Sequence, residues 1–143
     1  MLIDSMKELL ADTFNLYLKA HYYHWNVEGP DFKQYHDFFG DFYEEVYGSV
    51  DKIAEEIRAL DAYAPGSFER YLELSNIKGE EMIIPAKEML SRLDKDNNTY
   101  IMTLEKTYKF ADLENELGLA NFIQDRIDAH KKHKWMFKAF LKG

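Results

Sequence analysis

Two histidines and two acidic residues in the first half of the chain have side chains that can bind metal ions. His24 lies near the end of the first predicted helix, and His36 lies early in the second. Asp51 and Glu55 follow one turn apart, further along that second helix. Two imidazoles and two carboxylates suit Fe(II), Zn(II) or Mn(II), and their spacing does not choose among these ions. These four residues are the candidate metal ligands.

The positions of these residues restrict how they can meet. His36 and Asp51 are 15 residues apart on one helix, a separation of roughly 22 Å at the α-helical rise. His24 lies at the same end of the helical hairpin as His36, so it is equally far from the carboxylates. Two subunits packed antiparallel across a two-fold axis would bring the histidines of one chain to the carboxylates of the other. If these four residues bind one metal ion together, the site must therefore lie between subunits.

The flank of the second helix that carries Asp51 also carries Gly40 and Gly48. Glycine inside a helix costs about 1 kcal/mol relative to alanine, so these positions predict a close approach by another helix. The simpler interpretation remains open. A single exposed carboxylate is usually only solvated, and a single histidine beside aromatic residues is usually a core or boundary residue.

Other kinds of site are less compatible with the sequence. No Glu-x-x-His pair is present, which argues against a di-iron centre within one subunit. The absence of cysteine leaves only nitrogen and oxygen ligands for a metal and is consistent with a reducing, cytoplasmic environment. A net charge of −8 argues against a general nucleic-acid binder, and no apolar run is long enough to span a membrane.

The elements that position these residues are predicted to be helices of a single domain over residues 1–143. Ser5 and Glu8 have the spacing of a capping box at the first helix, Pro85 lies where a third helix begins, and Gly118 is the predicted stop of that helix. Two helical hairpins joined by one long crossover, itself with a short helix, predict an all-α four-helix bundle. The first two helices are predicted over residues 5–25 and 32–60, and the crossover over residues 61–84. The last two helices are predicted over residues 86–118 and 119–143.

Several segments resemble the Dps family (DNA-binding protein from starved cells) of the ferritin-like superfamily. The matching segments are HWNVEGPDF with His36, DKIAEEIRAL, SFERYLEL and DRIDAHKKHKWM. The resemblance implies a ferritin-like bundle and places His24, His36, Asp51 and Glu55 at the positions of the family's iron ligands. It implies a dimer-built dodecamer with ferroxidase sites at the two-fold interfaces. Fe(II) would be oxidised by hydrogen peroxide, in preference to oxygen, and stored as a ferric mineral that protects against oxidative damage.

The resemblance also implies roles for residues outside the ligand set. Trp25 would be an electron donor beside the site, although it could equally be a space-filling boundary aromatic. Asp125 and Asp128 would line a pore for iron, although they could equally be solvated. Many members of the family carry an aspartate where this chain has Gly40, so the resemblance predicts one well-defined iron position and a weak second one.

DNA binding is the family's other activity, and the sequence predicts that it is weak or absent here. The family's basic tail has no counterpart before the first helix, and the one lysine cluster lies on the last helix, where the helix dipole accounts for it. Two alternatives to the iron shell remain open. One is a DNA-compacting shell with a vestigial metal site, and the other is a structural bundle that binds zinc.

Overall fold

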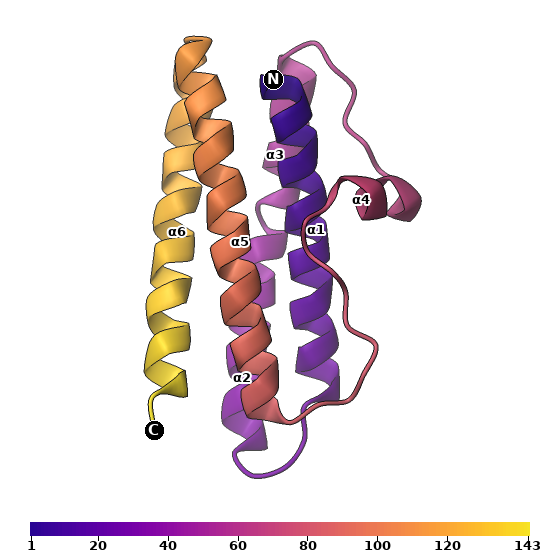
Figure 1. The fold of residues 1–143 in the computed structure, drawn as a ribbon, viewed down its shortest axis with the longest axis vertical. Helices are drawn as coiled ribbons and strands as arrows, with labels where there is room; N and C mark the ends of the chain where they lie inside the picture. The colour runs from indigo at the N-terminus through magenta and orange to yellow at the C-terminus, as the bar shows by residue number, and fades with distance from the viewer.

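Four long helical segments lie side by side in the computed structural model, which describes residues 1–143 (Figure 1). Three of them are single helices and the fourth is a kinked pair, while a short helix lies apart in the crossover. The structure contains no strand, and no helix in it is both long and apolar enough to cross a membrane. The prediction of an all-α four-helix bundle with a short helix in the crossover is confirmed. The helices are α1 (Leu2–Asn26), α2 (Phe32–Tyr47), α3 (Val50–Ala59), α4 (Phe68–Leu74), α5 (Ala86–Leu113) and α6 (Leu117–Leu141).

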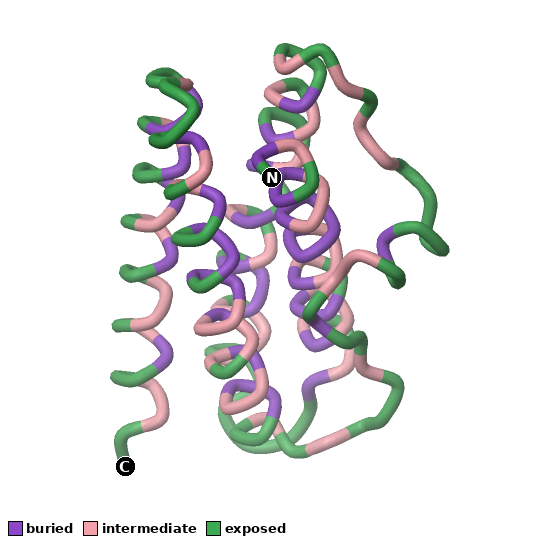
Figure 2. The backbone as a smooth tube through the Cα atoms, turned by 45° about the horizontal axis from the view of Figure 1, so that its top comes forward, coloured by how far each residue is buried: buried purple, intermediate pink, exposed green.

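The core lies between the long helices, each of which buries one face (Figure 2). Its largest fully buried side chains include the aromatic residues Tyr23, Phe39, Tyr100 and Phe137, one from each long segment. Aromatic residues bury a large apolar area each, so these four contribute heavily to the burial that stabilises the bundle. The functional side chains considered below are therefore held on rigid elements.

The second predicted helix is interrupted at Gly48 and Ser49, where the structure divides it into α2 and α3. Both residues keep right-handed backbone angles, but the Ser49 amide bonds the Val46 carbonyl, three residues back, at 3.1 Å. The Ser49 hydroxyl donates to the same carbonyl at 2.7 Å. Such local bonds tighten a turn and bend a helix. The prediction of one unbroken helix over residues 32–60 was wrong at this kink.

The turn between α5 and α6 also differs from the prediction, because α5 ends at Leu113 and Gly118 lies inside α6. Asn115 adopts a left-handed backbone conformation with φ 58°. The Glu116 amide then bonds the Ala111 carbonyl at 2.9 Å, which is the six-to-one bond of a Schellman motif. Asparagine tolerates this conformation because its short polar side chain bonds locally. It therefore ends the helix in place of the expected glycine.

The first helix begins at Leu2, and Ser5 does not cap it. Ser5 is buried, and its hydroxyl forms a 2.6 Å hydrogen bond with the Thr107 hydroxyl of α5. The predicted capping box at Ser5 and Glu8 was therefore wrong. The spacing that suggested a cap belongs to a buried contact between helices.

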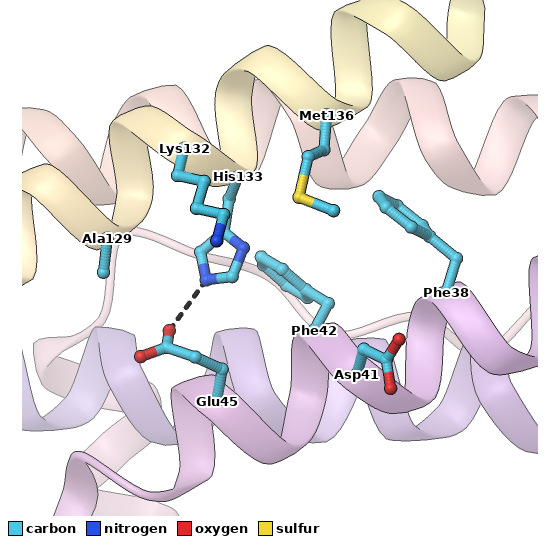
Figure 3. A pocket seen from close by; sticks show the side chains of 8 residues that line it. All are labelled: Phe38, Asp41, Phe42, Glu45, Ala129, Lys132, His133 and Met136. Carbon is cyan, nitrogen blue, oxygen red and sulfur yellow. Dashed lines mark hydrogen bonds and ion pairs between the residues drawn. The ribbon is translucent and has the colours of Figure 1, made fainter.

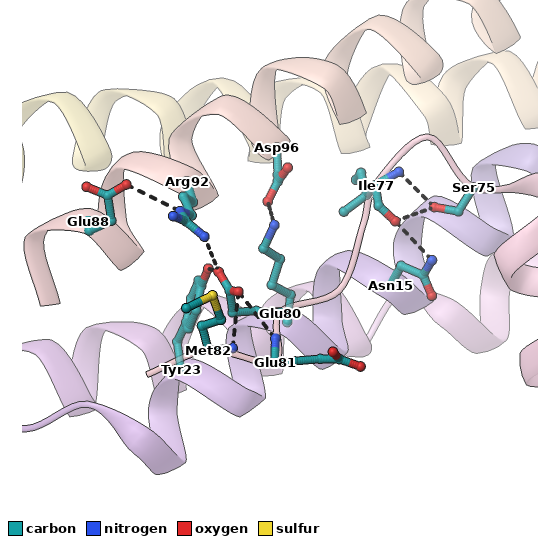
Figure 4. A network of polar contacts seen from close by, with 11 residues as sticks. Asn15, Tyr23, Ser75, Ile77, Glu80, Glu81, Met82, Glu88, Arg92 and Asp96 are labelled. Carbon is teal, nitrogen blue, oxygen red and sulfur yellow. Dashed lines mark hydrogen bonds and ion pairs between the residues drawn. The ribbon is translucent and has the colours of Figure 1, made fainter. Parts of the chain in front are cut away.

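The crossover is fastened to α1 and α5 by buried polar contacts. The fully buried Asp12 carboxylate accepts hydrogen bonds from Ser75, from the amide and side chain of Asn76, and from Thr103, at 2.6 to 3.1 Å. Nearer α5, Glu80 accepts from Tyr23 at 2.9 Å and from Arg92 at 2.6 Å (Figure 4). These contacts hold a long irregular segment in one course along the bundle.

Candidate metal centre

His24 and His36 form a reciprocal pair across the turn between α1 and α2. The His24 Nδ1 atom lies 2.7 Å from the His36 carbonyl oxygen, and the His36 Nδ1 atom lies 2.7 Å from the His24 carbonyl oxygen. Their rings stack with centroids 3.8 Å apart and an interplanar angle of 18°. The two side chains that the sequence predicted to act together are thus in contact within one chain.

These contacts fix which nitrogen of each ring is available to a metal. A carbonyl oxygen can only accept a hydrogen bond, so Nδ1 must carry the proton in both rings. In the neutral imidazole, Nε2 then holds a free lone pair, and no protein group bonds either Nε2 atom. Metal-bound histidines commonly donate their other ring N–H to a carbonyl in this way. Both rings are prepared as Nε2 ligands before any ion arrives.

Gly40 makes room for the His24 ring. A Cβ atom at Gly40 would lie 3.1 Å from both Cε1 and Nδ1 of His24. The sequence predicted that Gly40 and Gly48 admit a neighbouring helix, but the group that approaches Gly40 is a side chain of the same chain. At Gly48 the nearest groups are the Glu44 and Glu45 carbonyls of its own helix, where the kink occurs. Within one chain, the neighbours of the two glycines are thus the His24 ring and the helix's own carbonyls, and the close approach of a helix from another subunit stays a prediction.

A cluster of aromatic side chains around His21 packs next to the two histidines. His21 stacks on Tyr43 at 3.9 Å with an interplanar angle of 12°, and its Nδ1 atom is 2.9 Å from the Tyr17 hydroxyl. Trp25 packs on the other side of His21 at 3.9 Å and is 58% exposed. Burial and the neighbouring His24 lower the pKa of His21, so this ring is neutral at pH 7. Trp25 is therefore a surface residue next to the pair.

Asp51 and Glu55 are exposed on α3, and neither forms an ion pair or a side-chain hydrogen bond. The structure does not bring them to His24 and His36 within the chain, since no group of three metal-binding side chains includes any of these four residues. One chain therefore supplies two separate half-sites, one of histidines and one of carboxylates.

Other acidic residues near the histidines have different partners. Asp37 forms an ion pair with Lys33 at 2.8 Å, and this hydrogen bond holds the pKa of Asp37 below its usual range. Asp41 lines a cavity between α2 and α6. The Asp37 carboxylate is thus paired with Lys33, and Asp41 belongs to the wall of that cavity.

Asp125 and Asp128 are exposed on α6 and line one hollow between α5 and α6. The hollow has a volume of about 670 Å³ and also holds Glu105 and Lys109. Three carboxylates against one ammonium give it a negative balance, which attracts cations. The two aspartates predicted to line a pore thus share one surface hollow.

The structure also reveals a polar cluster that the sequence did not predict. Glu45 of α2 and His130 and His133 of α6 have ligand atoms within 4.8 Å of one another. The available signal was the i, i+3 spacing of the histidines, but Glu45 is 85 residues before His130. Only the packing of α2 against α6 identifies it as their neighbour.

Comparison with known proteins agrees with this fold. The chain matches the model of the ferritin-like domain over residues 3–143, so it belongs to the ferritin-like family. It is 33% identical over 146 residues to the DNA protection during starvation protein of Brevibacillus brevis, covering 96% of this chain and 97% of the relative.

Two solved structures are also similar. Antigen TpF1 from Treponema pallidum matches with a TM-score of 0.95 and 32% identity, covering 99% of this chain and 92% of that one. The Dps protein from Vibrio cholerae matches with a TM-score of 0.95 and 27% identity, covering 99% and 89%, and is described as a member of a broad superfamily of ferritin-like diiron-carboxylate proteins. Within the ferritin-like family, the chain is a member of the Dps group.

Proposed function

We propose that this chain is the subunit of a homo-oligomeric, dimer-built dodecameric shell that oxidises Fe(II) and stores ferric iron. Membership of the Dps group supports this, and the reciprocal pair of His24 and His36 carries the argument. That pair offers two free Nε2 lone pairs pointing away from its own hydrogen bonds. Iron is the substrate, and the protection against oxidative damage follows from consuming Fe(II) and oxidant together.

Each ferroxidase site would lie between two subunits. His24 and His36 of one subunit would bind Fe(II) with Asp51 and Glu55 of the other, giving two equivalent sites per dimer. Trp25, next to the histidine half-site, lines one hollow with Phe68 and Leu72. These three side chains are 58%, 68% and 71% exposed and suit a contact surface. Exposed apolar side chains of this size are typical of protein contacts.

The chemistry assigned to the site is a two-electron reduction of hydrogen peroxide. Two Fe(II) ions and two protons convert one peroxide to two water molecules, which avoids the one-electron step that releases hydroxyl radical. The two imidazoles and two carboxylates hold the first iron position, while Gly40 leaves the second with fewer ligands. Zn(II) or Mn(II) would compete at the same site. Trp25 would supply an electron when the second position is empty.

The proposal includes a route for iron and only weak or absent binding to DNA. The hollow that holds Asp125 and Asp128 would attract Fe(II) at the shell surface. A net charge of −8 repels phosphate, and Lys134 on α6 already donates to Asn98 at 2.8 Å.

The proposal is tested by loading the assembled protein with Fe(II) without oxygen and then adding hydrogen peroxide. We expect two Fe(II) consumed per peroxide, with Fe(III) eluting together with the protein on size exclusion. Glu55→Gln should slow the oxidation, whereas Glu56→Gln should not, because Glu56 is paired with Lys52 at 3.0 Å on the same helix. Equal effects of the two changes, or Fe(III) that leaves the protein unretained, would contradict the proposal.

A further inference from the structure

A cluster of polar side chains lies within the subunit, between α2 and α6. It consists of Glu45 from α2 with Arg126, His130 and His133 from α6. His130 is fully buried and Arg126 is 8% exposed, while the side chains of His133 and Glu45 are 12% and 38% exposed. Buried polar groups are costly unless they are paired, so this cluster requires an explanation.

His130 is held in the orientation of a metal ligand. Its Nδ1 atom lies 2.6 Å from the Asn97 side-chain oxygen, and the Asn97 amide donates to the His130 carbonyl at 3.0 Å. The second bond fixes which end of the Asn97 side chain faces the ring, so Nδ1 must be the donor. Nε2 then carries the lone pair, which accepts a hydrogen bond from Arg126 at 3.1 Å. This is the outer-shell support that positions metal-bound histidines.

His133 and Glu45 supply the other two ligand atoms. His133 Nε2 lies 2.7 Å from Glu45 Oε1, and the two side chains face each other across the gap between α6 and α2 (Figure 3). Burial alone would raise the pKa of Glu45, but the hydrogen bonds and charges of His133 and Arg126 lower it well below its usual range. Glu45 is therefore an anionic oxygen ligand next to two imidazoles.

Arg126 occupies the position of a cation among these three ligands. Its guanidinium donates to both Glu45 oxygens, at 2.5 and 3.0 Å, and to His130 Nε2. Its Nε atom is buried and has no hydrogen-bond partner. An arginine that leaves a buried donor unpaired matches the pocket incompletely. The guanidinium thus pairs with Glu45 and His130 but leaves its own Nε donor buried without a partner.

A cavity of about 340 Å³ leads to the cluster from the surface. Glu45 and His133 form part of its wall, together with Asp41 and the apolar side chains of Phe42 and Met136 (Figure 3). A small ion can therefore approach Glu45 and His133 from the surface, while His130 is fully buried. Asp41 and Lys132 also line the cavity, so its wall carries charges of both signs beside Glu45.

We propose that Glu45, His130 and His133 form a second metal site, inside each subunit, that binds a divalent ion of the zinc and iron class in competition with Arg126. One carboxylate and two imidazoles are ligands for such ions, with water from the cavity completing the coordination. The three ligand atoms lie within 4.8 Å of one another. Ligand atoms around a tetrahedral ion lie about 3.4 Å apart. The His133–Glu45 pair at 2.7 Å must therefore open slightly, while wider pairs close. Binding displaces the guanidinium and releases the Nε2 proton of His133 or moves it to Nδ1.

The proposal predicts that the wild-type site binds metal weakly and that removal of Arg126 strengthens binding. Zn²⁺ is titrated by calorimetry, and Co²⁺ by its visible absorption, into protein that carries His24→Ala and His36→Ala to disable the interface site. Arg126→Gln in this background should tighten Zn²⁺ binding by about tenfold or more, because the ion no longer breaks charged hydrogen bonds. Adding His133→Gln should abolish the gain and the Co²⁺ bands.

Arg92→Gln is the matched control, since it removes an arginine from an ion pair with Glu80 that has no histidine ligand. It should leave Zn²⁺ affinity unchanged. Circular dichroism and size exclusion establish that each variant is folded and assembled. A second test replaces Arg126→Gln if that variant does not fold. Weak Zn²⁺ binding by the protein that retains Arg126 still supports the site when His133→Gln removes that binding. Absence of Zn²⁺ binding in every folded variant, or equal affinity with and without Arg126, overturns it.

Discussion

At the scale of single residues, the interface half-site depends on the way in which two histidines fix each other. His24 and His36 could be identified from the sequence by type and spacing, because few side chains bind metals. Their tautomer could not be predicted, since it depends on each ring reaching the other's backbone carbonyl across the turn. The same contact explains Gly40, which must lack a side chain for the His24 ring to lie where it does.

Gly40→Ala is expected to slow Fe(II) oxidation by about tenfold, because even a small misplacement of a reacting group is costly. The new Cβ would lie 3.1 Å from the His24 ring, which cannot retreat while it stacks on His36. The initial rate after addition of hydrogen peroxide measures the effect. Gly118→Ala is the control, because nothing lies within 4 Å of that helical position. Equal rates for the two variants would show that His24 tolerates displacement.

At the scale of helices and their connections, periodic apolar residues were enough to predict four long helical segments and the crossover between them. The interruptions were harder to predict because they depend on local hydrogen bonds. Ser49 bends its helix by bonding Val46, and Asn115 ends its helix without a glycine. Ser5 matched a capping pattern, yet its hydroxyl bonds Thr107, 102 residues away. Such contacts appear only when the helices have packed.

Asp12→Ala is expected to lower the free energy of unfolding by about 3 kcal/mol, because it leaves buried donors of the crossover and α5 without their charged acceptor. Urea denaturation followed by circular dichroism measures the change. Asp4→Ala, at a side chain that is 84% exposed, should shift the same free energy by less than about 0.5 kcal/mol. A loss below about 1 kcal/mol at Asp12 would mean that the crossover is not held by this carboxylate.

Glu80→Gln is expected to destabilise the protein more at pH 7 than in acid. Burial alone would raise the pKa of Glu80, but hydrogen bonds from Tyr23, the Met82 amide and Arg92 lower it below its ordinary value. A carboxyl group whose pKa is lower in the folded chain than in the unfolded chain stabilises the folded state at pH values above its unfolded pKa. This stabilisation is lost as the pH falls through the pKa of the folded chain.

The stability difference between wild type and Glu80→Gln should therefore shrink as pH falls below the ordinary range for glutamate. Urea midpoints measured from neutral pH into acid follow it. Glu81→Gln, at the exposed neighbouring residue, should show no such trend. A difference that stays constant with pH would mean that Glu80 has the same pKa in the folded and unfolded chains.

At the scale of the whole molecule, the fold keeps the histidines of the proposed interface site apart from its carboxylates. It brings a different set of metal-binding side chains together between α2 and α6. The number of residues between His36 and Asp51, converted to a distance with the α-helical rise, predicted that they cannot meet within one chain. The structure keeps them apart. The sequence could not predict that Glu45 would meet His130, because that contact depends on how α2 packs against α6. A bundle of this kind can thus carry two separate half-sites at its surface and a different ligand set inside.

A mixture of two inactive variants tests whether the surface half-sites combine between subunits. His36→Ala and Asp51→Ala should each lose most of the Fe(II) oxidation rate when assembled alone. In a shell assembled from equal amounts, half of the dimers contain one of each variant, and each such dimer has one intact site and one doubly defective site. About a quarter of all sites, and about a quarter of the wild-type rate, should return.

The control for this mixture combines His24→Ala with His36→Ala. Both changes damage the histidine half of the site, so every dimer of this pair has two defective sites and no activity should return. Recovery in the first mixture but not in the second requires that histidines and carboxylates come from different subunits. If neither mixture exceeds the mean of its parent proteins, the four ligands do not combine across a dimer, and the iron site must be sought within one chain.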